Sequence, residues 1–338
     1  MAHLGEFTLR SGYSIPQLGF GTWQSAPGQV GEAVYEALKI GYRHLDLATI
    51  YRNQSEIAKG IQRAYKEVPG LKREDIFITS KLWNNQHHPE EVEPALDACL
   101  KEIGIDYIDL YLIHWPVAFA KGDEFIPLDA SSSHERGDAL IDETVSIIDT
   151  WKAMTQLPKD KVRNIGVANH NVEQLDAIIK GTGVIPAVNQ VERHPFLLDN
   201  DLVRYCHEKG IHITAYSPLG NNNLGLPLVI THPVIQEVAA SASERLGEPV
   251  SGANVVIAWA QVGGHSVIPK SVTPSRIREN FKSVTLTDEE ISNVESLGKD
   301  RKRYNIPYSY YKPRWDINIF NEPEEKAASR RPVFTKRA

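Results

Sequence analysis

Four side chains that can move protons or carry charge follow short apolar runs in the first third of the chain. Asp46 interrupts the first of these runs and Tyr51 follows it closely, while Lys81 and His114 each stand at the end of a later run. An aspartate at the end of a buried strand has lost much of its water, so it needs a cation or a set of hydrogen-bond donors. We therefore expect Lys81 to pair with Asp46, with Tyr51 and His114 nearby.

These residues suit the reduction of a carbonyl group, which requires a hydride on carbon and a proton on oxygen. Tyr51 is the expected proton donor. Because the pKa of a free tyrosine is about 10, it is a weak acid at neutral pH, and we expect the Lys81 ammonium to lower that pKa by favouring the phenolate. Asp46 would hold Lys81 charged and in place, and His114 is suited to hydrogen-bond the carbonyl oxygen and orient the substrate.

Alternating strand and helix patterns provide the framework for these residues. After a predicted hairpin at 7–18, strand patterns occur near 19–21, within 41–51, and at 76–81, 107–114, 161–167, 187–191, 211–216 and 265–268. Helical patterns occur at 29–38, 55–65, 91–100, 144–154, 172–179, 199–208, 233–246, 253–261 and 274–281, and a capping box at Thr287 begins a last helix. The four candidate residues thus lie at or just after the carboxyl ends of successive strands.

Alternating units with near-continuous apolar strands predict a parallel sheet covered by helices. Eight such units close most naturally into a (β/α)8 TIM barrel, an α/β fold in which the reactive groups come from the carboxyl ends of several strands. The main alternative is an open doubly wound sheet, whose dinucleotide-binding form places GxGxxG directly after the first strand. Gly19 and Gly21 are followed by Thr22, Trp23 and Gln24, so this fingerprint is absent and we predict the barrel.

Composition narrows the possible partners and locations. The 338 residues are 41% hydrophobic and carry a net charge of -6, so nothing favours nucleic-acid binding. No run approaches the ~18 apolar residues of a membrane-spanning helix, and residues 1–6 have no signal-peptide pattern. Cys99 and Cys206 show no disulfide framework. We expect a cytoplasmic monomer whose partners are small molecules, without nucleic acid or membrane.

Six motifs carry a resemblance to a known family. GYRHLDLATIYRNQ, ITSKLW, LYLIHWP, VNQVERHP, AYSPLG and IPKSVTPSRIREN occur in this order between about residues 20 and 280. Together they resemble the successive signatures of the aldo-keto reductase superfamily, and most of all its aldose, aldehyde and glycerol-type reductases. The resemblance implies a (β/α)8 barrel that binds NADPH without a Rossmann domain. It also implies the same four catalytic roles for Asp46, Tyr51, Lys81 and His114.

The segment after the last predicted strand suits an anion. Thr273 is a predicted N-cap and Pro274 a first helical residue, so a helix amino terminus with the cations Lys270 and Arg276 faces the barrel mouth. Phosphate sites in such barrels frequently lie after the eighth strand. The alternative is a capped surface helix with incidental basic residues. The resemblance implies that the adenosine 2'-phosphate of NADPH is held by Lys270, Ser271, Thr273 and Arg276.

The resemblance assigns residues along the rest of the cofactor. Asn169 and Gln190 are implied to bind the nicotinamide carboxamide, Tyr216 to stack on its ring, and Ser217 and Leu219 to lie along the pyrophosphate. Further implied contacts are Thr22, Trp23, Val272, Glu279 and Asn280, of which the last two lie toward the adenine. Where family members usually have Ser-Asn-Phe, this chain has Ala168-Asn169-His170, so a hydroxyl contact to the carboxamide is absent.

Aromatic residues near the predicted mouth suggest the substrate pocket. Trp23, Trp83 and Trp115 each follow a strand end on the catalytic side, and with His114 we expect them to line the pocket rather than pack in the core.

Two long segments are expected to define specificity. The loop 116–143 is polar and long, and the tail 303–320 is too rich in aromatic residues for a disordered linker, so we expect it to lie across the barrel mouth. The barrel domain would then span 1–321. The charged segment 322–338 is expected to be a solvated extension.

The leading hypothesis is an NADPH-dependent carbonyl reductase that reversibly reduces an aldehyde or aldose to the alcohol. A non-catalytic NADP(H)-binding barrel subunit is the alternative, and loss of a catalytic residue would have favoured it. A metal-dependent hydrolase would need clustered histidines and carboxylates, but His87, His88 and His134 lack metal-ligand spacing, and we predict no metal. Sugars, glyceraldehyde and simple aromatic aldehydes remain open as substrates. A short hydroxylated aldehyde is favoured because the tail's tyrosines can hydrogen-bond hydroxyl groups.

Overall fold

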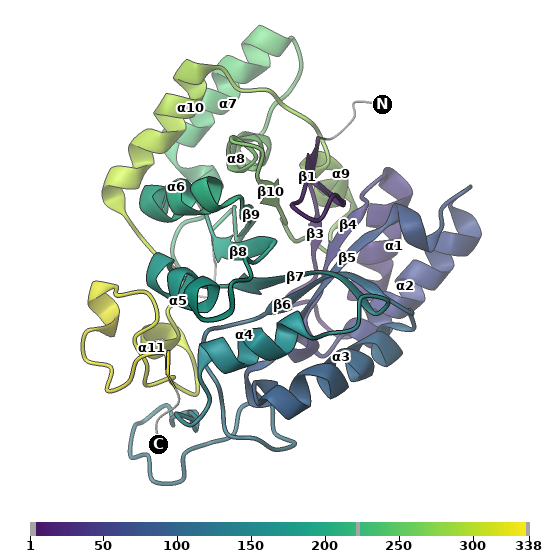
Figure 1. Ribbon diagram of the computed structural model, residues 1–338. Helices are drawn as coiled ribbons and strands as arrows, with labels where there is room; N and C mark the ends of the chain where they lie inside the picture. Colours follow the sequence, from purple (N-terminus) through teal and green to yellow (C-terminus); the bar gives the residue numbers. More distant parts are fainter. Residues whose placement is uncertain (1–4, 221–223, 336–338) are drawn as a thin grey trace.

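A curled sheet of eight parallel strands forms the centre of the molecule (Figure 1). The computed structural model describes residues 5–220 and 224–335. The strands follow the order β10-β9-β8-β7-β6-β5-β4-β3, so each pairs with its neighbour in the sequence. They are β3 (Phe20–Gly21), β4 (His44–Asp46), β5 (Phe77–Leu82), β6 (Ile108–Ile113), β7 (Val162–Ala168), β8 (Val188–Glu192), β9 (His212–Tyr216) and β10 (Ser266–Val267).

Hydrogen bonds between the two edges close this sheet into a barrel. Leu18, which precedes β3, pairs in parallel with Val267 of β10. The N–H of Gly21 donates to the carbonyl oxygen of Pro269 at 3.0 Å. A Cβ atom at Gly21 would lie 2.9 Å from the carbonyl oxygen of Ile268, so glycine permits this close approach. The predicted (β/α)8 barrel is confirmed.

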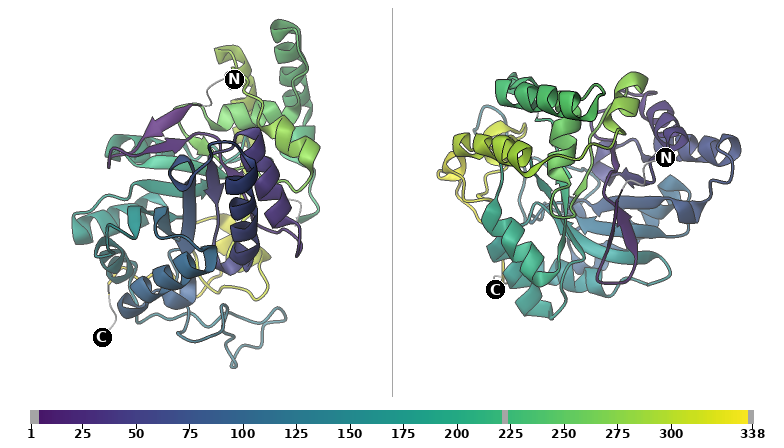
Figure 2. Two further views of the ribbon diagram at one scale, coloured as in Figure 1. Left: turned by 90° about the vertical axis from the view of Figure 1, so that its right-hand side faces the viewer. Right: turned by 90° about the horizontal axis from the view of Figure 1, so that it is seen from above.

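Helices cover the outside of the barrel (Figures 1 and 2). Strands β5 and β6 are buried along their whole length, as expected of strands covered on both faces. The helices are α1 (Val30–Ile40), α2 (Gln54–Glu67), α3 (Pro89–Ile103), α4 (Ile147–Thr155), α5 (Val172–Thr182), α6 (Asn200–Lys209), α7 (Pro233–Leu246), α8 (Gly252–Ala260), α9 (Pro274–Asn280), α10 (Asp288–Glu295) and α11 (Pro307–Tyr310).

The ends of these elements follow from local chemistry. Helix α7 has the predicted limits, and the predicted capping box at the start of α10 is formed by Thr287 and Glu290. Helix α4 begins later than expected because Ser146 is its N-cap and accepts a hydrogen bond from the N–H of Asp149. Strand β10 is shorter than expected, since Pro269 has no N–H with which to extend the ladder.

The predicted hairpin covers the amino-terminal end of the barrel. Strands β1 (Glu6–Thr8) and β2 (Ser14–Pro16) pair antiparallel. Leu9 and Ile15 pack against Phe77 and Val188, the first residues of β5 and β8. Figure 2 shows this hairpin in purple, apart from the yellow carboxyl-terminal segment.

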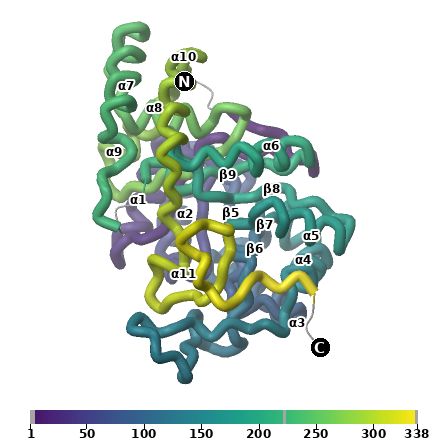
Figure 3. Tube along the Cα trace, turned by 90° about the vertical axis from the view of Figure 1, so that its left-hand side faces the viewer, coloured from purple at the N-terminus to yellow at the C-terminus, as the bar shows by residue number. Residues whose placement is uncertain are grey.

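The loop 116–143 and the tail 303–320 lie side by side at the other end (Figure 3). The N–H of Ala139 donates to the carbonyl oxygen of Arg314, and the N–H of Arg314 donates to that of Gly137, both at 2.8 Å. The tail contains α11 and buries Trp315 in a cluster that includes residues from the carboxyl ends of β5 and β6. It therefore crosses the barrel mouth, as predicted.

The segment that follows the tail is not the solvated extension that we expected. Glu325 and Pro332 are buried, Phe334 packs against the main core, and the N–H of Ile147 donates to the carbonyl oxygen of Val333 at 2.9 Å. The expectation was wrong because a charged composition does not exclude docking: the carboxylate of Glu325 accepts three backbone N–H groups, which compensate its burial. Residues 336–338 of that segment lie outside the described part of the chain.

Within residues 5–220 and 224–335, no helix is long and apolar enough to cross a membrane. The same residues contain no group of three or more His, Cys, Asp or Glu side chains placed to hold a metal ion. Cys99 and Cys206 are buried free thiols. Residues 1–4, part of the amino terminus considered above, are not among those described.

Candidate active site

Asp46 and Lys81 form a buried ion pair at the carboxyl ends of their strands. Asp46 pairs in register with Thr79 of β5, so Lys81, two residues further along β5, points to the same side of the sheet. Lys81 Nζ lies 2.9 and 2.8 Å from the two carboxylate oxygens of Asp46 and donates to the carbonyl oxygen of Leu47 at 2.8 Å. The expected pairing is therefore confirmed. Burial lowers the pKa of Lys81, and the adjacent carboxylate counters that shift.

Further polar groups hold Asp46 in place. The side-chain amide of Gln190 on β8 donates to Asp46 Oδ1 at 2.7 Å. The hydroxyl of Thr22, which follows β3, donates to the backbone carbonyl of Asp46 at 2.8 Å. Thr22 is fully buried, whereas the neighbouring Trp23 is 36% exposed. Of these two predicted cofactor residues, Thr22 thus helps to hold Asp46, while Trp23 is exposed.

Tyr51 lies next to the ion pair but its pKa shifts in the opposite direction from our expectation. It ends a short 3-10 turn, Thr49–Tyr51, and its hydroxyl is 3.4 Å from Lys81 Nζ. Loss of hydration raises the pKa of Tyr51 well above 10, and the carboxylate of Asp46 acts in the same direction. The expectation failed because Asp46 neutralises the ammonium that was to stabilise the phenolate. Tyr51 is consequently a protonated phenol at neutral pH, which is the form a proton donor requires.

His114 faces Tyr51 from the end of β6. The two rings are 5.9 Å apart between centroids in an edge-to-face arrangement. Burial lowers the pKa of His114 well below 6.5, and the nearby charge of Lys81 contributes to that shift. The imidazole is therefore neutral and can donate a single hydrogen bond to an oxygen atom. Its Nδ1 atom has no hydrogen-bond partner among the described residues.

Three residues predicted to hold the nicotinamide surround this group. Asn169, directly after β7, donates from Nδ2 to the backbone carbonyl of His114 at 2.9 Å and accepts at Oδ1 from the Tyr216 hydroxyl at 2.7 Å. Tyr216 ends β9, and Gln190 joins the same region through its bond to Asp46. The backbone of Asn169 has a φ of +60°, a left-handed conformation that asparagine tolerates better than most residues. Strands β7, β8 and β9 therefore bring Asn169, Gln190 and Tyr216 together beside Asp46 and His114.

The departure from the family pattern at 168–170 is an interior feature. The ring of His170 is buried and its Nδ1 atom is 2.8 Å from the carbonyl oxygen of Ala168. Burial lowers the pKa of His170 to about 4, so the ring is neutral. His170 therefore occupies the place of a core aromatic residue, and Ala168 supplies no hydroxyl to the site.

The predicted phosphate segment runs from β10 into α9. Lys270 is half-buried and donates from Nζ to the carbonyl oxygen of Gln24 at 2.9 Å, and burial lowers the pKa of Lys270. Thr273 is the N-cap residue of α9, but its side chain makes no capping hydrogen bond. Arg276 is exposed and has no hydrogen-bond or ion-pair partner among residues 5–220 and 224–335. The segment thus presents two cations, one of them unpaired within the described chain.

The other predicted cofactor residues differ in their surroundings. Ser217 follows β9 with a φ of +49°, and Leu219 packs against the main core. Ser271 and Val272 are half-buried, and the Ser271 hydroxyl accepts a hydrogen bond from the N–H of Thr273 at 3.1 Å. Glu279 is exposed whereas Asn280 is buried.

The predicted pocket tryptophans fall into two groups. Trp83 and Trp115 are buried and lie on either side of His114, with centroid distances of 5.2 and 6.3 Å to its ring. Trp23 stands apart at the rim. The indole N–H of Trp83 donates to the carbonyl oxygen of Phe125 at 2.6 Å, so the loop 116–143 is fixed to Trp83.

Two tail residues pack against these tryptophans and were not assigned to the site from sequence. Trp315 lies 5.9 Å from Trp83 and 5.3 Å from Trp115 between ring centroids, and Tyr311 lies 6.0 Å from Trp115. The aromatic density of the tail indicated that it would dock, but not which rings would meet the strand-end tryptophans.

Comparisons with known proteins agree with this geometry. The model described as Aldo/keto reductase family matches residues 17–299. The D/L-glyceraldehyde reductase of Hypocrea jecorina is 59% identical over 327 residues, which cover 97% of each chain. Aldo-keto reductase family 1 member A1 of Homo sapiens is 41% identical over 307 residues, covering 88% of this chain and 90% of that protein.

Solved structures show the same fold. The aldose reductase from Schistosoma japonicum superimposes with a TM-score of 0.79 at 39% identity, covering 88% of this chain and 93% of the other. The aldose reductase from Giardia lamblia superimposes with a TM-score of 0.81 at 36% identity, covering 90% and 98%.

Proposed function

Because the chain belongs to the aldo/keto reductase family, whose members use NADP(H), we propose that it reduces short hydroxylated aldehydes with NADPH and that Tyr51 donates the proton. The protein is an NADP-dependent oxidoreductase that acts on aldehydes or aldoses. The proposal adds the substrate class, the roles of individual residues and the phosphate on the cofactor.

One observation carries the assignment of the catalytic residues. A continuous set of contacts joins Asp46 to Lys81 and Lys81 to the hydroxyl of Tyr51, and the ring of His114 lies edge-to-face with the ring of Tyr51. A structural ion pair needs only the first of these contacts. The presence of a protonated phenol and a neutral imidazole beside the pair supports a site for proton transfer to oxygen.

In the proposed reaction, each residue of this group has a separate role. Bound NADPH supplies the hydride. His114 donates a hydrogen bond to the carbonyl oxygen, which orients the substrate and stabilises the negative charge that grows there. Tyr51 gives its proton to that oxygen; although its pKa is raised, an alkoxide is more basic than a phenolate, so the transfer remains favourable. Asp46 holds the Lys81 ammonium 3.4 Å from the Tyr51 hydroxyl, where it offsets part, but not all, of the cost of forming the phenolate that Tyr51 leaves behind.

The chemistry of the surrounding residues fits a phosphorylated nicotinamide cofactor. The amide groups of Asn169 and Gln190 suit a carboxamide, and the ring of Tyr216 suits stacking on an aromatic base. Lys270 and Arg276 are cations near the end of β10, and the unpaired, exposed guanidinium of Arg276 suits a phosphate group. We infer that these residues hold NADPH, with Lys270 and Arg276 at the 2'-phosphate.

The pocket favours a small substrate that carries hydroxyl groups. Trp83, Trp115 and Trp315 leave an aromatic wall beside His114, and Tyr311 adds a hydroxyl that can hydrogen-bond a polyol. The 59% identity to a D/L-glyceraldehyde reductase supports the same substrate class.

The test is a set of NADPH oxidation rates with glyceraldehyde, short aldoses and aromatic aldehydes, repeated with NADH. We expect glyceraldehyde to be among the best substrates and NADPH to be preferred. Tight NADPH binding without turnover of any aldehyde would instead support the alternative of a non-catalytic binding subunit.

A further inference from the structure

The start of the tail is bound to a buried carboxylate at the end of β8. Glu192 accepts the backbone N–H groups of Tyr304 at 2.7 Å and Asn305 at 2.8 Å, and the side-chain amide of Asn305 at 3.0 Å. His194 Nε2 lies 2.8 Å from Glu192 Oε1, the oxygen that also accepts the N–H of Tyr304. Because Glu192 is nearly fully buried, these donors compensate its charge, and displacement of the tail would remove the three donors of Tyr304 and Asn305 and leave His194.

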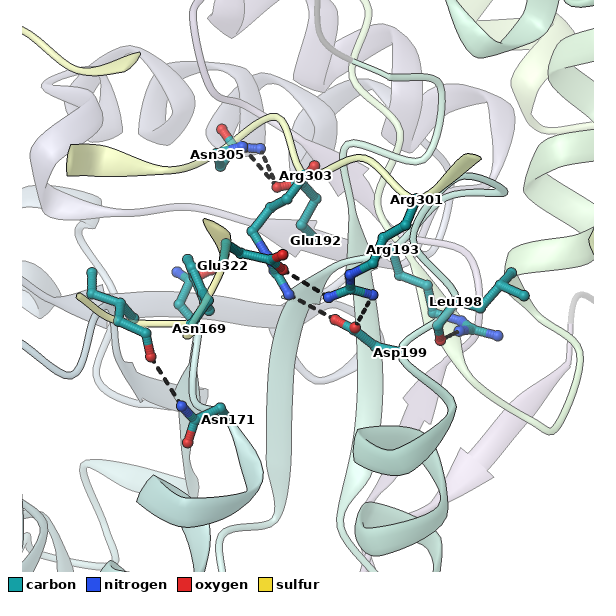
Figure 4. A network of polar contacts seen from close by, with 12 residues as sticks. Asn169, Asn171, Glu192, Arg193, Leu198, Asp199, Arg301, Arg303, Asn305 and Glu322 are labelled. Atoms are coloured by element: carbon teal, nitrogen blue, oxygen red, sulfur yellow. Dashed lines mark hydrogen bonds and ion pairs between the residues drawn. The ribbon is translucent and has the colours of Figure 1, made fainter. Parts of the chain in front are cut away.

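Arg303, the residue just before this attachment, links the start of the tail to Glu322, which follows the end of the tail. Arg303 donates from Nε to Glu322 Oε1 at 2.9 Å and from Nη2 to Asp199 Oδ2 at 2.7 Å (Figure 4). Asp199 is the N-cap residue of α6, so Arg303 connects both ends of the tail to one helix of the barrel. We call Arg303, Asp199 and Glu322 the clasp. The guanidinium also stacks on Phe320, with 4.0 Å to the ring centroid.

A second arginine contacts the same carboxylates from the outside. Arg301 pairs with Asp199 at 2.6 Å and with Glu322 at 2.7 Å, but its side chain is 45% exposed, whereas that of Arg303 is 6% exposed. Exposed ion pairs contribute little because water and salt screen them. The chain therefore offers two arginines with the same partners and different burial.

The far end of the tail is attached independently. The carbonyl oxygen of Ile319 accepts hydrogen bonds from Asn171 at 2.9 Å and from Gln174 at 2.8 Å, at the start of α5. Between the two attachments lie Tyr311 and Trp315, which pack against Trp115 in the pocket wall. The attachments thus fix the position of the rings that limit the space beside His114.

We propose that Arg303 is a specificity-determining residue, because the clasp holds the tail closed over the pocket and so restricts the enzyme to small aldehydes. This inference rests on the proposed function. Among the described residues, Arg303 makes no hydrogen bond or ion pair with the proposed catalytic group or with the predicted cofactor residues, although its charge partly offsets the rise in the pKa of Tyr216 that burial causes. It acts through the positions of Tyr311 and Trp315. It is a positioning residue rather than a catalytic one.

The experiment compares Arg303→Met with Arg301→Met in the full-length protein. In Arg303→Met, both carboxylates of the clasp retain Arg301 as a partner, so no acid is left unpaired. We expect this variant to raise kcat/KM for a two-ring aromatic aldehyde relative to glyceraldehyde by at least about fivefold, with the Kd for NADPH within about twofold. Arg301→Met should leave the ratio unchanged.

Amide hydrogen exchange supplies a readout that does not depend on turnover. Exchange at Tyr304 and Asn305, whose N–H groups bind Glu192, should be at least about tenfold faster in Arg303→Met than in the parent or in Arg301→Met. If Arg303→Met fails to fold, Glu322→Gln is measured in the same way, because it weakens the clasp while both arginines keep Asp199.

The outcomes separate this inference from the proposed function. A parent protein that reduces no aldehyde refutes the proposed function and, with it, the claim on specificity. An active parent with an unchanged aldehyde ratio in Arg303→Met overturns the clasp as a specificity device, whether or not exchange is faster. Equal changes in the two arginine variants also overturn it.

Discussion

Replacement of Tyr51 with phenylalanine should lower kcat strongly while changing the free energy of unfolding very little. The Tyr51 hydroxyl makes one long contact, 3.4 Å to Lys81 Nζ, and Lys81 keeps both oxygens of Asp46 and the carbonyl oxygen of Leu47 when that hydroxyl is removed. No buried charge is left unpaired. The free energy of unfolding should therefore fall by less than about 1 kcal/mol.

The effect on turnover should be far larger. A positioned general acid contributes about 10²–10⁴-fold to a rate, which corresponds to about 3–5 kcal/mol of activation free energy. We expect kcat of Tyr51→Phe to fall by that factor at saturating NADPH and glyceraldehyde. The Kd for NADPH, measured from quenching of its fluorescence, should stay within a few-fold, because Tyr51 lies away from Lys270 and Arg276.

The matched control is Tyr311→Phe, which removes another tyrosine hydroxyl from the same pocket. Tyr311 packs on Trp115 and Trp315 through its ring, which phenylalanine retains. This variant should raise KM for hydroxylated aldehydes and leave kcat within several-fold. If Tyr51→Phe keeps more than about a tenth of the parent kcat, Tyr51 is not the proton donor and His114 becomes the first alternative.

Three other outcomes are expected. The double variant Lys270→Ala, Arg276→Ala should weaken NADPH binding by at least about tenfold, since charge-assisted contacts are worth about 1.5–3 kcal/mol each before screening. In titrations of both cofactors, the Kd for NADH should be nearly unchanged. Lys81→Met should lower the free energy of unfolding, measured in urea, by about 3–5 kcal/mol, because Asp46 stays buried without its cation. The control Lys180→Met removes an exposed ion pair with Asp176 and should change the free energy of unfolding very little. The profile of kcat/KM against pH should be flat through neutrality. The raised pKa of Tyr51 keeps this residue protonated until above about pH 10, and the lowered pKa of His114 keeps the imidazole neutral until well below about pH 6.5. A titration in kcat/KM near pH 7 to 8 would contradict both assignments.

The proximity of the proposed catalytic residues was predictable because each of them is marked by a local sequence pattern. Each of Asp46, Lys81 and His114 stands at the end of a short apolar run, and parallel strands bring their carboxyl ends to one face of a barrel. The register of β4 and β5 then places Lys81 beside Asp46 without any further information. The barrel itself followed from the eight repeated units, and the glycines that close it fit tight strand packing rather than a dinucleotide fingerprint.

The pKa of Tyr51 was not predictable from the same residues. Its direction depends on whether Lys81 acts as a free charge or as half of a neutral pair, and on how much water the ring loses. The pairing of Lys81 is decided by two distances: its Nζ atom is closer to the Asp46 carboxylate, at 2.8 Å, than to the Tyr51 hydroxyl, at 3.4 Å. Sequence order gives neither distance, so the sign of the shift appears only in the structure.

The attachments of the tail were likewise outside the reach of sequence patterns. Glu192 and Tyr304 are 112 positions apart, and Arg303 and Asp199 are 104 apart. Composition indicated an aromatic tail and a charged end, but it did not show that Glu325 would be buried among backbone N–H groups. Pairings of this kind depend on the closed barrel, which first brings the ends of β8, α5 and α6 to the same face.

Strand β8 contacts both Asp46 and the start of the tail. Gln190 and Glu192 are two positions apart on β8, so their side chains lie on the same face of the strand. Gln190 binds Asp46 of the catalytic pair, and Glu192 binds the first residues of the tail. A single buried strand therefore fixes both Asp46 of the proposed catalytic group and the start of the tail. Because both contacts are buried, the tail cannot shift at this point without exposing a carboxylate that the strand holds in place. The freedom left to the tail lies between its two attachments, where Tyr311 and Trp315 pack against Trp115.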